Sequence, residues 1–252
     1  MRSADRALAA LDFLVDAAPE AVRVTDVAHH LELSLATASR LLATLAERGY
    51  ASRTSERRFT VGPRSLLLAS KWMASVRAAA AAPLGRASAA TGEGVMLAQL
   101  LGDVLVSVAW QPPATAEPAM TAKLATLGPT FPVWATATGR AMLGKLSPAQ
   151  RARLLPPEPF PRLTERSITN CADLRAVIRD GERSGLHVED GEADPEMWCG
   201  AVALERGGRE EVLALAIISR GVPSAAQRSR IYKALRRECQ DVGYALATPS
   251  QP

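Results

Sequence analysis

The chain of 252 residues has few of the residues that build covalent or metal-bound frameworks. Its three cysteines, Cys171, Cys199 and Cys239, show no CxxC or Cys/His spacing, and it has only three histidines. This spacing argues against a disulfide scaffold and a structural zinc site, so we expect neither metal nor cofactor. No GxGxxG follows a strand and no P-loop occurs, which argues against a nucleotide-binding enzyme.

Long apolar segments are also missing. No apolar run approaches the ~20 residues that span a bilayer, and the N-terminus lacks the basic-then-apolar pattern of a signal segment. We therefore expect a cytoplasmic protein without a membrane partner. Hydrophobic residues make up 48% of the chain, which is enough for a core, and the length suggests two domains. The net charge of +4 is compatible with DNA binding but is weak evidence for it.

Residues 24–62 are the most informative stretch, because they predict a helix, a tight turn, a second helix and a short hairpin. Thr25 is a candidate cap for the first helix and Ser34 for the second, and Gly49 stands where a helix end favours positive φ. The inner faces expected from the apolar spacing are Val27, Ala28 and Leu31 in the first helix, and Leu35, Ala38, Leu41, Leu42 and Leu45 in the second.

This order of elements is typical of a winged helix-turn-helix that binds duplex DNA. The outer side of the second helix is small, polar or cationic, as a helix in the major groove requires, and the hairpin carries three arginines that suit a phosphate backbone or the minor groove. The alternative is an ordinary helical subdomain with a solvated basic loop. The predicted DNA-binding residues are Ser34, Ala36, Thr37, Ser39, Arg40, Thr44, Arg53, Arg57 and Arg58.

The other elements divide the chain into three parts: a DNA-binding domain over 1–62, linker helices over 63–90 and a ligand-binding domain over 91–248. A first helix is expected over 3–17. The linker is predicted as one helix over 64–82 and another starting at Pro83. Its apolar residues cover more than one stripe, which indicates burial on two sides, partly against a second subunit; an interior helix of a monomer is the alternative.

The last part has the pattern of an α+β domain, with helices flanking an antiparallel sheet. Gly102-Asp103 is a strong hairpin signal between two apolar runs, and Gly207-Gly208 is a second predicted turn. Strands are expected near 95–101, 104–110, 120–124, 186–189, 199–205 and 211–219, and helices near 136–146, 148–155, 172–184 and 224–244.

The chain resembles the IclR family of bacterial transcriptional regulators. The resemblance covers nearly the whole chain and depends on the order and spacing of SADRALAALDFL at 3–14, SLATASRLLATLAERGY at 34–50, RRFTVGPRSLLLA at 57–69, FPVWATATGRAMLG at 131–144, RSITNCADL at 166–174 and MWCGAVAL at 197–204. It implies a GAF/PAS-like effector domain that binds a small metabolite, and homodimers or dimers of dimers on pseudo-palindromic operators, more often as repressors than activators.

The resemblance also implies where the effector lies, against the sheet with its polar end at the start of the helix over 136–146. A helix N-terminus suits a carboxylate because its N–H groups are unpaired. Trp134 and Ile217 replace a histidine and a serine common in the family, which favours an acid with an apolar or aromatic body; tryptophans that are simply core residues are the alternative. The predicted effector site comprises Met96, Trp110, Trp134, Thr136, Ala137, Thr138, Gly139, Arg140, Glu189, Met197, Cys199, Ile217 and Ser219.

Two other functions compete with this interpretation. One is an enzyme with Cys199 as nucleophile and His187 nearby, although a cysteine in an apolar strand is usually a small buried hydrophobe. The other is a winged-helix module that binds protein, which would have no need for the converging cations at Arg40 and the hairpin.

Overall fold

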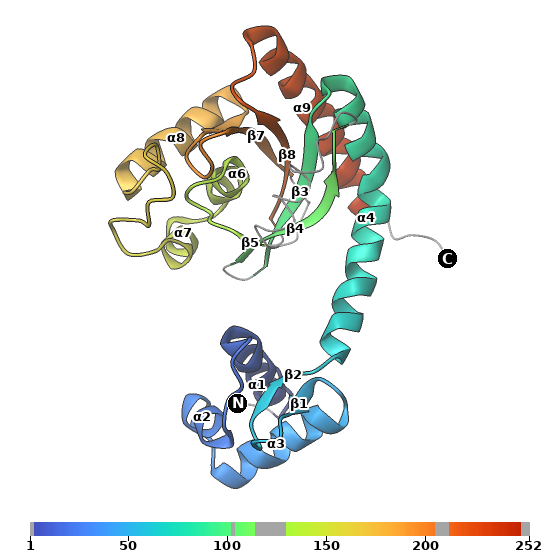
Figure 1. Ribbon diagram of the computed structural model, residues 1–252, viewed down its shortest axis with the longest axis vertical. Helices are drawn as coiled ribbons and strands as arrows, with labels where there is room; N and C mark the ends of the chain where they lie inside the picture. Colours follow the sequence, from blue (N-terminus) through green and yellow to red (C-terminus); the bar gives the residue numbers. More distant parts are fainter. Residues whose placement is uncertain (1–2, 102–103, 114–129, 205–211, 248–252) are drawn as a thin grey trace. The chain divides into compact units, whose positions relative to one another are not determined.

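The computed structural model describes residues 3–101, 104–113, 130–204 and 212–247. The chain forms two compact units, Met1–Ala74 and Ser75–Pro252. Figure 1 traces both, and each is described here by itself. The strand predicted near 120–124 and the turns predicted at 102–103 and 207–208 lie outside the described residues. Among the described helices, none has the length and apolar character to cross a membrane.

The first unit packs three helices and a hairpin around one small core. Its elements are α1 (Ser3–Ala17), α2 (Val24–His30), α3 (Leu35–Glu47), β1 (Ala51–Arg53) and β2 (Phe59–Val61), followed by the first part of α4 (Arg64–Thr91). Leu14, Val27 and Leu42 are fully buried in this core, and Phe59 closes it from the hairpin. β1 and β2 pair antiparallel, with Ser52 opposite Thr60. This arrangement is the predicted winged helix-turn-helix.

The ends of these helices test the capping predictions. Ser34 caps α3 as expected, and Gly49 has a φ of +77° behind the helix. The prediction for Thr25 is wrong: Arg23 precedes α2, and the Asp26 carboxylate accepts the Arg23 N–H at 2.8 Å. Asp26 fulfils the capping role from inside the first turn, as acidic residues at that position often do.

The predicted break at Pro83 is also wrong. α4 continues from Arg64 to Thr91 with Pro83 inside it. Proline removes one helical hydrogen bond, but Pro83, Leu84 and Ala87 are all buried in the core of the second unit. Packing of this apolar side keeps the helix continuous, although local propensity opposes it.

The second unit is built on a six-stranded antiparallel sheet in the order β5-β4-β3-β8-β7-β6 (Figure 1). The strands are β3 (Gly94–Leu101), β4 (Val104–Gln111), β5 (Thr130–Phe131), β6 (His187–Asp190), β7 (Met197–Leu204) and β8 (Leu213–Arg220). The helices are α6 (Ala137–Lys145), α7 (Pro148–Leu154), α8 (Cys171–Ser184) and α9 (Ala225–Ala247). The predicted antiparallel-sheet domain of mixed α+β class is thereby confirmed.

Two apolar layers cover the two faces of this sheet. The C-terminal part of α4 and helix α9 pack on one face, whose buried side chains include Val95, Leu215 and Ile217. Helices α6 and α8 pack on the other face, over Met96, Cys199 and Ile218. On the first face, Arg86 of α4 binds the fully buried Glu238 of α9 at 2.6 Å, and this ion pair joins the two helices. The sheet therefore separates two interiors, and only one of them adjoins α6.

Candidate functional site

The exposed side of α3 is the first candidate site. The Ser34 Oγ accepts the Thr37 N–H at 3.3 Å and lies 2.8 Å from the Thr37 Oγ1, so the cap engages both hydroxyls. The Thr44 hydroxyl donates to the Arg40 carbonyl at 2.9 Å. Arg40, by contrast, is exposed and has no recorded ion pair within the described residues. Of the predicted polar contacts on α3, Ser39 and Arg40 are therefore the side chains most available to a ligand.

The start of α3 holds a residue that the apolar spacing misassigned. Leu35 was placed on the inner face, but it is 58% exposed, whereas Ala38, Leu42 and Leu45 form the buried stripe. Leu35 and Ala36 give the surface an apolar part beside Ser39 and Arg40. Apolar side chains on a recognition helix can contact thymine methyl groups. The signal that could have found Leu35 is its position directly after the cap, one turn before the stripe begins.

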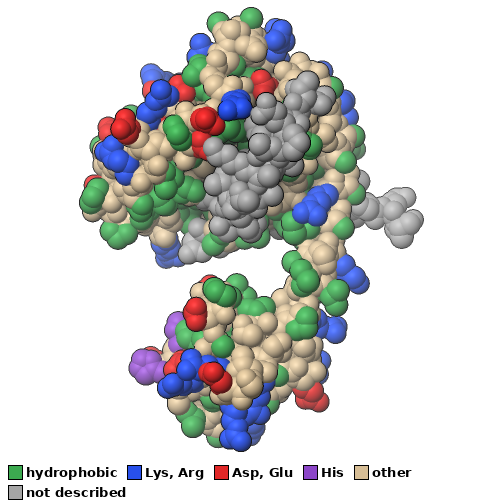
Figure 2. Space-filling view, viewed as in Figure 1, with side chains coloured by type: hydrophobic (Ala, Val, Ile, Leu, Met, Phe, Trp, Pro, Cys, Tyr) green, Lys and Arg blue, Asp and Glu red, His purple; other side chains and the backbone are tan. Residues whose placement is uncertain are grey.

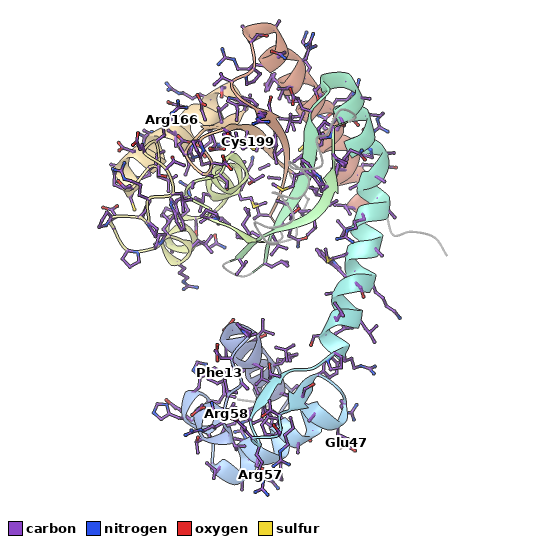
Figure 3. The ribbon with its side chains drawn as sticks, in the orientation of Figure 1. Phe13, Glu47, Arg57, Arg58, Arg166 and Cys199 are labelled. Atoms are coloured by element: carbon purple, nitrogen blue, oxygen red, sulfur yellow. The ribbon has the colours of Figure 1, made fainter. Side chains whose placement is uncertain are left out.

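The hairpin places its three arginines in different surroundings. Arg57 is exposed in the turn with a φ of +61°, and no ion pair is recorded for it in the described part of the chain. Arg58 is half-buried, donates to the Ala21 carbonyl at 3.5 Å and lies 3.4 Å from Glu56. The Arg53 guanidinium lies over the Phe59 ring. Figure 3 labels Arg57 and Arg58 on this unit, and Figure 2 shows Lys and Arg side chains gathered on it. Arg57 is thus the wing arginine with the fewest contacts among the described residues, and the one most available to DNA.

The second candidate site lies at the N-terminus of α6. The Thr136 Oγ1 accepts the Gly139 N–H at 3.1 Å and donates to the Pro132 carbonyl at 3.1 Å. The N–H groups of Ala137 and Thr138 have no acceptor among the described residues, and a helix start of this kind favours an anion. At Gly139 a Cβ would lie 2.1 Å from the Val133 carbonyl oxygen, so the preceding turn requires glycine there.

The sheet divides the predicted effector residues into two groups. Met96, Trp110, Trp134, Met197 and Cys199 pack in the same apolar layer as α6. Ile217 and Ser219 lie on the opposite face: Ile217 is in the α4/α9 layer, and Ser219 bonds the Glu93 carboxylate. Because side chains alternate across a strand, a shift of one residue in the matched motif explains the error. Ala216 and Ile218 are the β8 residues that face α6.

Three buried donors on the α6 face have no hydrogen-bond partner among the residues that the structure describes. They are the Trp110 Nε1, the Trp134 Nε1 and the Thr138 Oγ1. Most buried polar atoms in proteins are paired, since an unpaired one costs free energy. The Trp134 and Phe160 rings, 6.1 Å apart, add an aromatic wall. The arrangement can hold a ligand with an aromatic body and hydrogen-bond acceptors.

Arg140 does not point to this anion site. Its guanidinium is 1% exposed, donates to the Val188 carbonyl at 2.7 Å and forms an ion pair with Glu192 at 2.9 Å. It therefore holds the loop after β6. The neighbouring Glu189 accepts the N–H groups of Glu192 and Ala193, yet burial raises its pKa to about 7. Glu189 therefore gains or loses its charge near pH 7, and it lies in the sheet next to the apolar layer that contains α6.

Neither Cys199 nor His187 has the pKa that covalent catalysis requires. Cys199, labelled in Figure 3, is buried in β7, and burial together with Glu189 raises the pKa of its thiol well above the usual value. Burial, and then Arg140 and Lys145, lower the pKa of His187 to about 4. A neutral thiol is a poor nucleophile. In the described part of the chain, no group of three or more His, Cys, Asp or Glu side chains could hold a metal ion.

Comparison with known proteins agrees with both halves of the structure. The IclR helix-turn-helix domain matches residues 3–55, and the bacterial transcriptional regulator IclR C-terminal domain matches residues 72–244. The HTH-type transcriptional regulator Rv1719 of Mycobacterium tuberculosis is 29% identical over 85% of this chain and 79% of its own.

Two solved structures share the fold. An IclR transcriptional regulator from Silicibacter sp. aligns with a TM-score of 0.73 at 24% identity, over 98% of both chains. An IclR homologue from Microbacterium hydrocarbonoxydans, complexed with 4-hydroxybenzoate, aligns with a TM-score of 0.64 at 20% identity, over 95% of this chain and 98% of its own.

These matches cover both units, and they exclude the enzyme interpretation because the family consists of regulators. The chain belongs to the IclR family of transcriptional regulators, with a DNA-binding helix-turn-helix domain and a C-terminal effector-binding domain.

Proposed function

We propose that this regulator binds a pseudo-palindromic operator, with α3 in the major groove and the β1–β2 wing along the backbone, as a cytoplasmic repressor. The observation that supports the placement is the pair of exposed cations without ion pairs in the described residues, Arg40 on α3 and Arg57 in the wing. Arginines in these positions provide base or phosphate contacts. Ser39, Ala36 and Leu35 supply the close, uncharged part of the contact surface.

We further propose a homodimer, or a dimer of dimers, formed along the N-terminal part of α4. Leu66 is 70% exposed, Leu67 60% and Trp72 38%, and Leu8 of α1 is 62% exposed. Several large apolar side chains left exposed in one unit favour a protein interface over solvated surface. A two-fold pairing there presents two copies of α3 to two half-sites of one operator.

The effector that fits the second unit is an acid with an aromatic body. Its carboxylate would accept the N–H groups of Ala137 and Thr138. Its ring would lie between Trp110 and Trp134, whose buried N–H groups have no partner in the described part of the chain. The 4-hydroxybenzoate bound to the Microbacterium homologue has this chemistry. Effector binding would change operator affinity only if the acid binds the DNA-competent and DNA-incompetent states differently.

The experiment is a titration of the protein with benzoate, 4-hydroxybenzoate and pyruvate, followed by tryptophan fluorescence and thermal stability. Trp134→Phe and Thr138→Val each remove one unpaired donor, and each should weaken aromatic-acid binding about tenfold. Trp198→Phe is the matched control, because Trp198 is buried in the opposite layer. A response to pyruvate alone, or equal losses in all three variants, would overturn the proposed effector class.

A further inference from the structure

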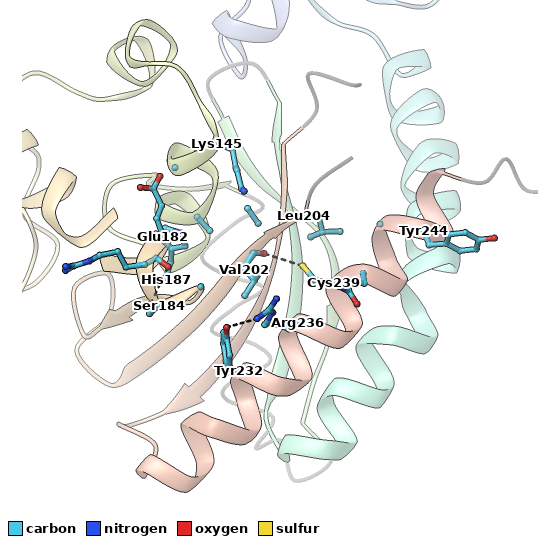
Figure 4. A pocket seen from close by; sticks show the side chains of 18 residues that line it. Lys145, Glu182, Ser184, His187, Val202, Leu204, Tyr232, Arg236, Cys239 and Tyr244 are labelled. Carbon is cyan, nitrogen blue, oxygen red and sulfur yellow. Dashed lines mark hydrogen bonds between the residues drawn. The ribbon is translucent and has the colours of Figure 1, made fainter. Parts of the chain in front are cut away.

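A cavity of about 840 Å³ lies in the C-terminal unit, away from the N-terminus of α6 (Figure 4). It lies at the edge of the sheet where β6 begins: the first residue of β6, His187, pairs with Ala201 of β7, and the last three residues of β7 border the cavity. The ends of α6 and α8 form one wall and α9 the other. None of the predicted effector residues lines it. Its volume lies within the ~300–1,000 Å³ typical of small-ligand sites.

His187 is the buried polar group of this cavity. Its side chain lies between α8 and α6. A Cβ on Gly181 of α8 would lie 2.2 Å from the His187 Nδ1, and one on Gly144 of α6 would lie 3.6 Å from its Cε1. The residue is 7% exposed, and its Nδ1 has no hydrogen-bond partner within the described ranges. Gly181 therefore makes room for a ring whose Nδ1 no described residue satisfies, whereas a side chain at Gly144 would meet the ring at ordinary contact distance. Such a group in a cavity wall is suited to bonding a ligand.

Arg236 is the cation of this cavity that is open to a ligand. Lys145 and Arg183 line it too, as does the carboxylate of Glu182, but Arg183 is ion-paired with Asp180. The Arg236 guanidinium lies over the Tyr232 ring and donates to its hydroxyl at 3.1 Å, as Figure 4 shows, but it has no recorded ion pair within the described residues. The floor, formed by Val202, Leu204 and Cys239, is apolar. A charged rim over an apolar floor fits an anion with a carbon skeleton.

We propose that this cavity is a second ligand site, which binds a small organic anion with its acidic group at Arg236, its skeleton on Val202 and Leu204, and a polar atom at His187. The anionic group is a carboxylate, sulfonate or phosphate ester, since all three offer acceptors to the same cation.

Both ends of one buried helix then carry a ligand. Ala137 and Thr138 begin α6 at the proposed effector site, whereas Gly144 and Lys145 end it at this cavity. Every residue from Ala137 to Leu143 is buried, so a displacement at either end is transmitted to the packed layer. The second anion should therefore change the affinity for the effector, and the effector should change the affinity for the anion by the same factor. Only this coupling rests on the proposed function of the α6 N-terminus.

The test uses 1-anilinonaphthalene-8-sulfonate, an organic anion whose fluorescence rises in apolar surroundings, with the full-length protein. Arg236→Gln removes the charge that faces the cavity, and Gln240→Trp fills the space from an exposed position on α9. Each should weaken probe binding about tenfold. Arg230→Gln is the matched control, because Arg230 is an exposed arginine on α9 outside the cavity.

Thr138→Val separates the two sites. It should leave probe affinity unchanged, since Thr138 does not line the cavity, whatever its effect on aromatic acids. Equal losses in Arg236→Gln and Arg230→Gln would indicate attraction to surface charge and overturn the proposal. Unchanged affinity in both cavity variants, or a loss in Thr138→Val alone, would overturn it as well. Near-ultraviolet circular dichroism checks that each variant remains folded.

Discussion

The buried carboxyl of Glu189 leads to a prediction about stability and pH. Glu189 is 3% exposed, and its pKa rises from 4.5 to about 7 because burial disfavours the charge. A folded pKa above the unfolded one means that the native state holds the proton more tightly. The stability that this group contributes is therefore complete below pH 4.5 and declines as the pH rises toward 7. At ~1.36 kcal/mol for each pKa unit, the loss is about 3 kcal/mol as an upper bound.

Glu189→Gln removes the titrating group and keeps one oxygen for the N–H groups of Glu192 and Ala193. The difference in free energy of unfolding, variant minus wild type, should rise by up to about 3 kcal/mol between pH 4.5 and pH 8. Urea unfolding monitored by tryptophan fluorescence measures it, and the exposed Glu165→Gln is the control. A difference that stays constant over this range, or falls with pH, would refute the assigned environment of Glu189.

Four further substitutions test the rest of the structure. Arg40→Ala should weaken operator binding in a gel-shift assay without lowering the melting temperature; unchanged affinity would contradict the placement of α3. Arg57→Ala should reduce the slope of log affinity against log salt by about 1, and a slope equal to that of wild type would show that the wing does not contact phosphate. Ser34→Ala should destabilise the first unit by about 1 kcal/mol through loss of the α3 cap, as measured by chemical unfolding; no loss would mean that the cap bond is not formed. Gly181→Ala should destabilise the second unit by about 1–3 kcal/mol, because its Cβ would lie 2.2 Å from the His187 Nδ1; a neutral result would show that the ring can move aside.

The helix-turn-helix could be predicted from the sequence because its signals are local. A cap at Ser34, a periodic stripe and a glycine at the helix end act within a few residues, and all three appear in the structure. Leu35 was misassigned because periodicity does not fix where a stripe begins, and the first turn of α3 faces outward. The wing could be located as a hairpin, but only packing shows that Arg58 is held by Ala21 and Glu56.

The features that could not be predicted from the sequence depend on packing between residues far apart in the chain. Pro83 lies inside a continuous helix because α4 is buried against the sheet at that point. Ile217 was assigned to the wrong face because a shift of one residue exchanges the two sides of a strand. The ion pair of Arg140 with Glu192 joins positions 52 residues apart in the sequence, and no local pattern indicates such a contact. The start of α6 could be predicted, because Thr136 caps the helix through a bond to the Gly139 N–H that depends on neighbouring residues alone.

The most direct measurement is fluorescence anisotropy with labelled DNA from upstream of the protein's own gene, titrated over salt concentration with and without an aromatic acid. The account predicts tight, salt-sensitive binding to one pseudo-palindromic site, weakened by Arg40→Ala and shifted by the acid. Binding that shows no sequence preference at any salt concentration, with or without the acid, would contradict it.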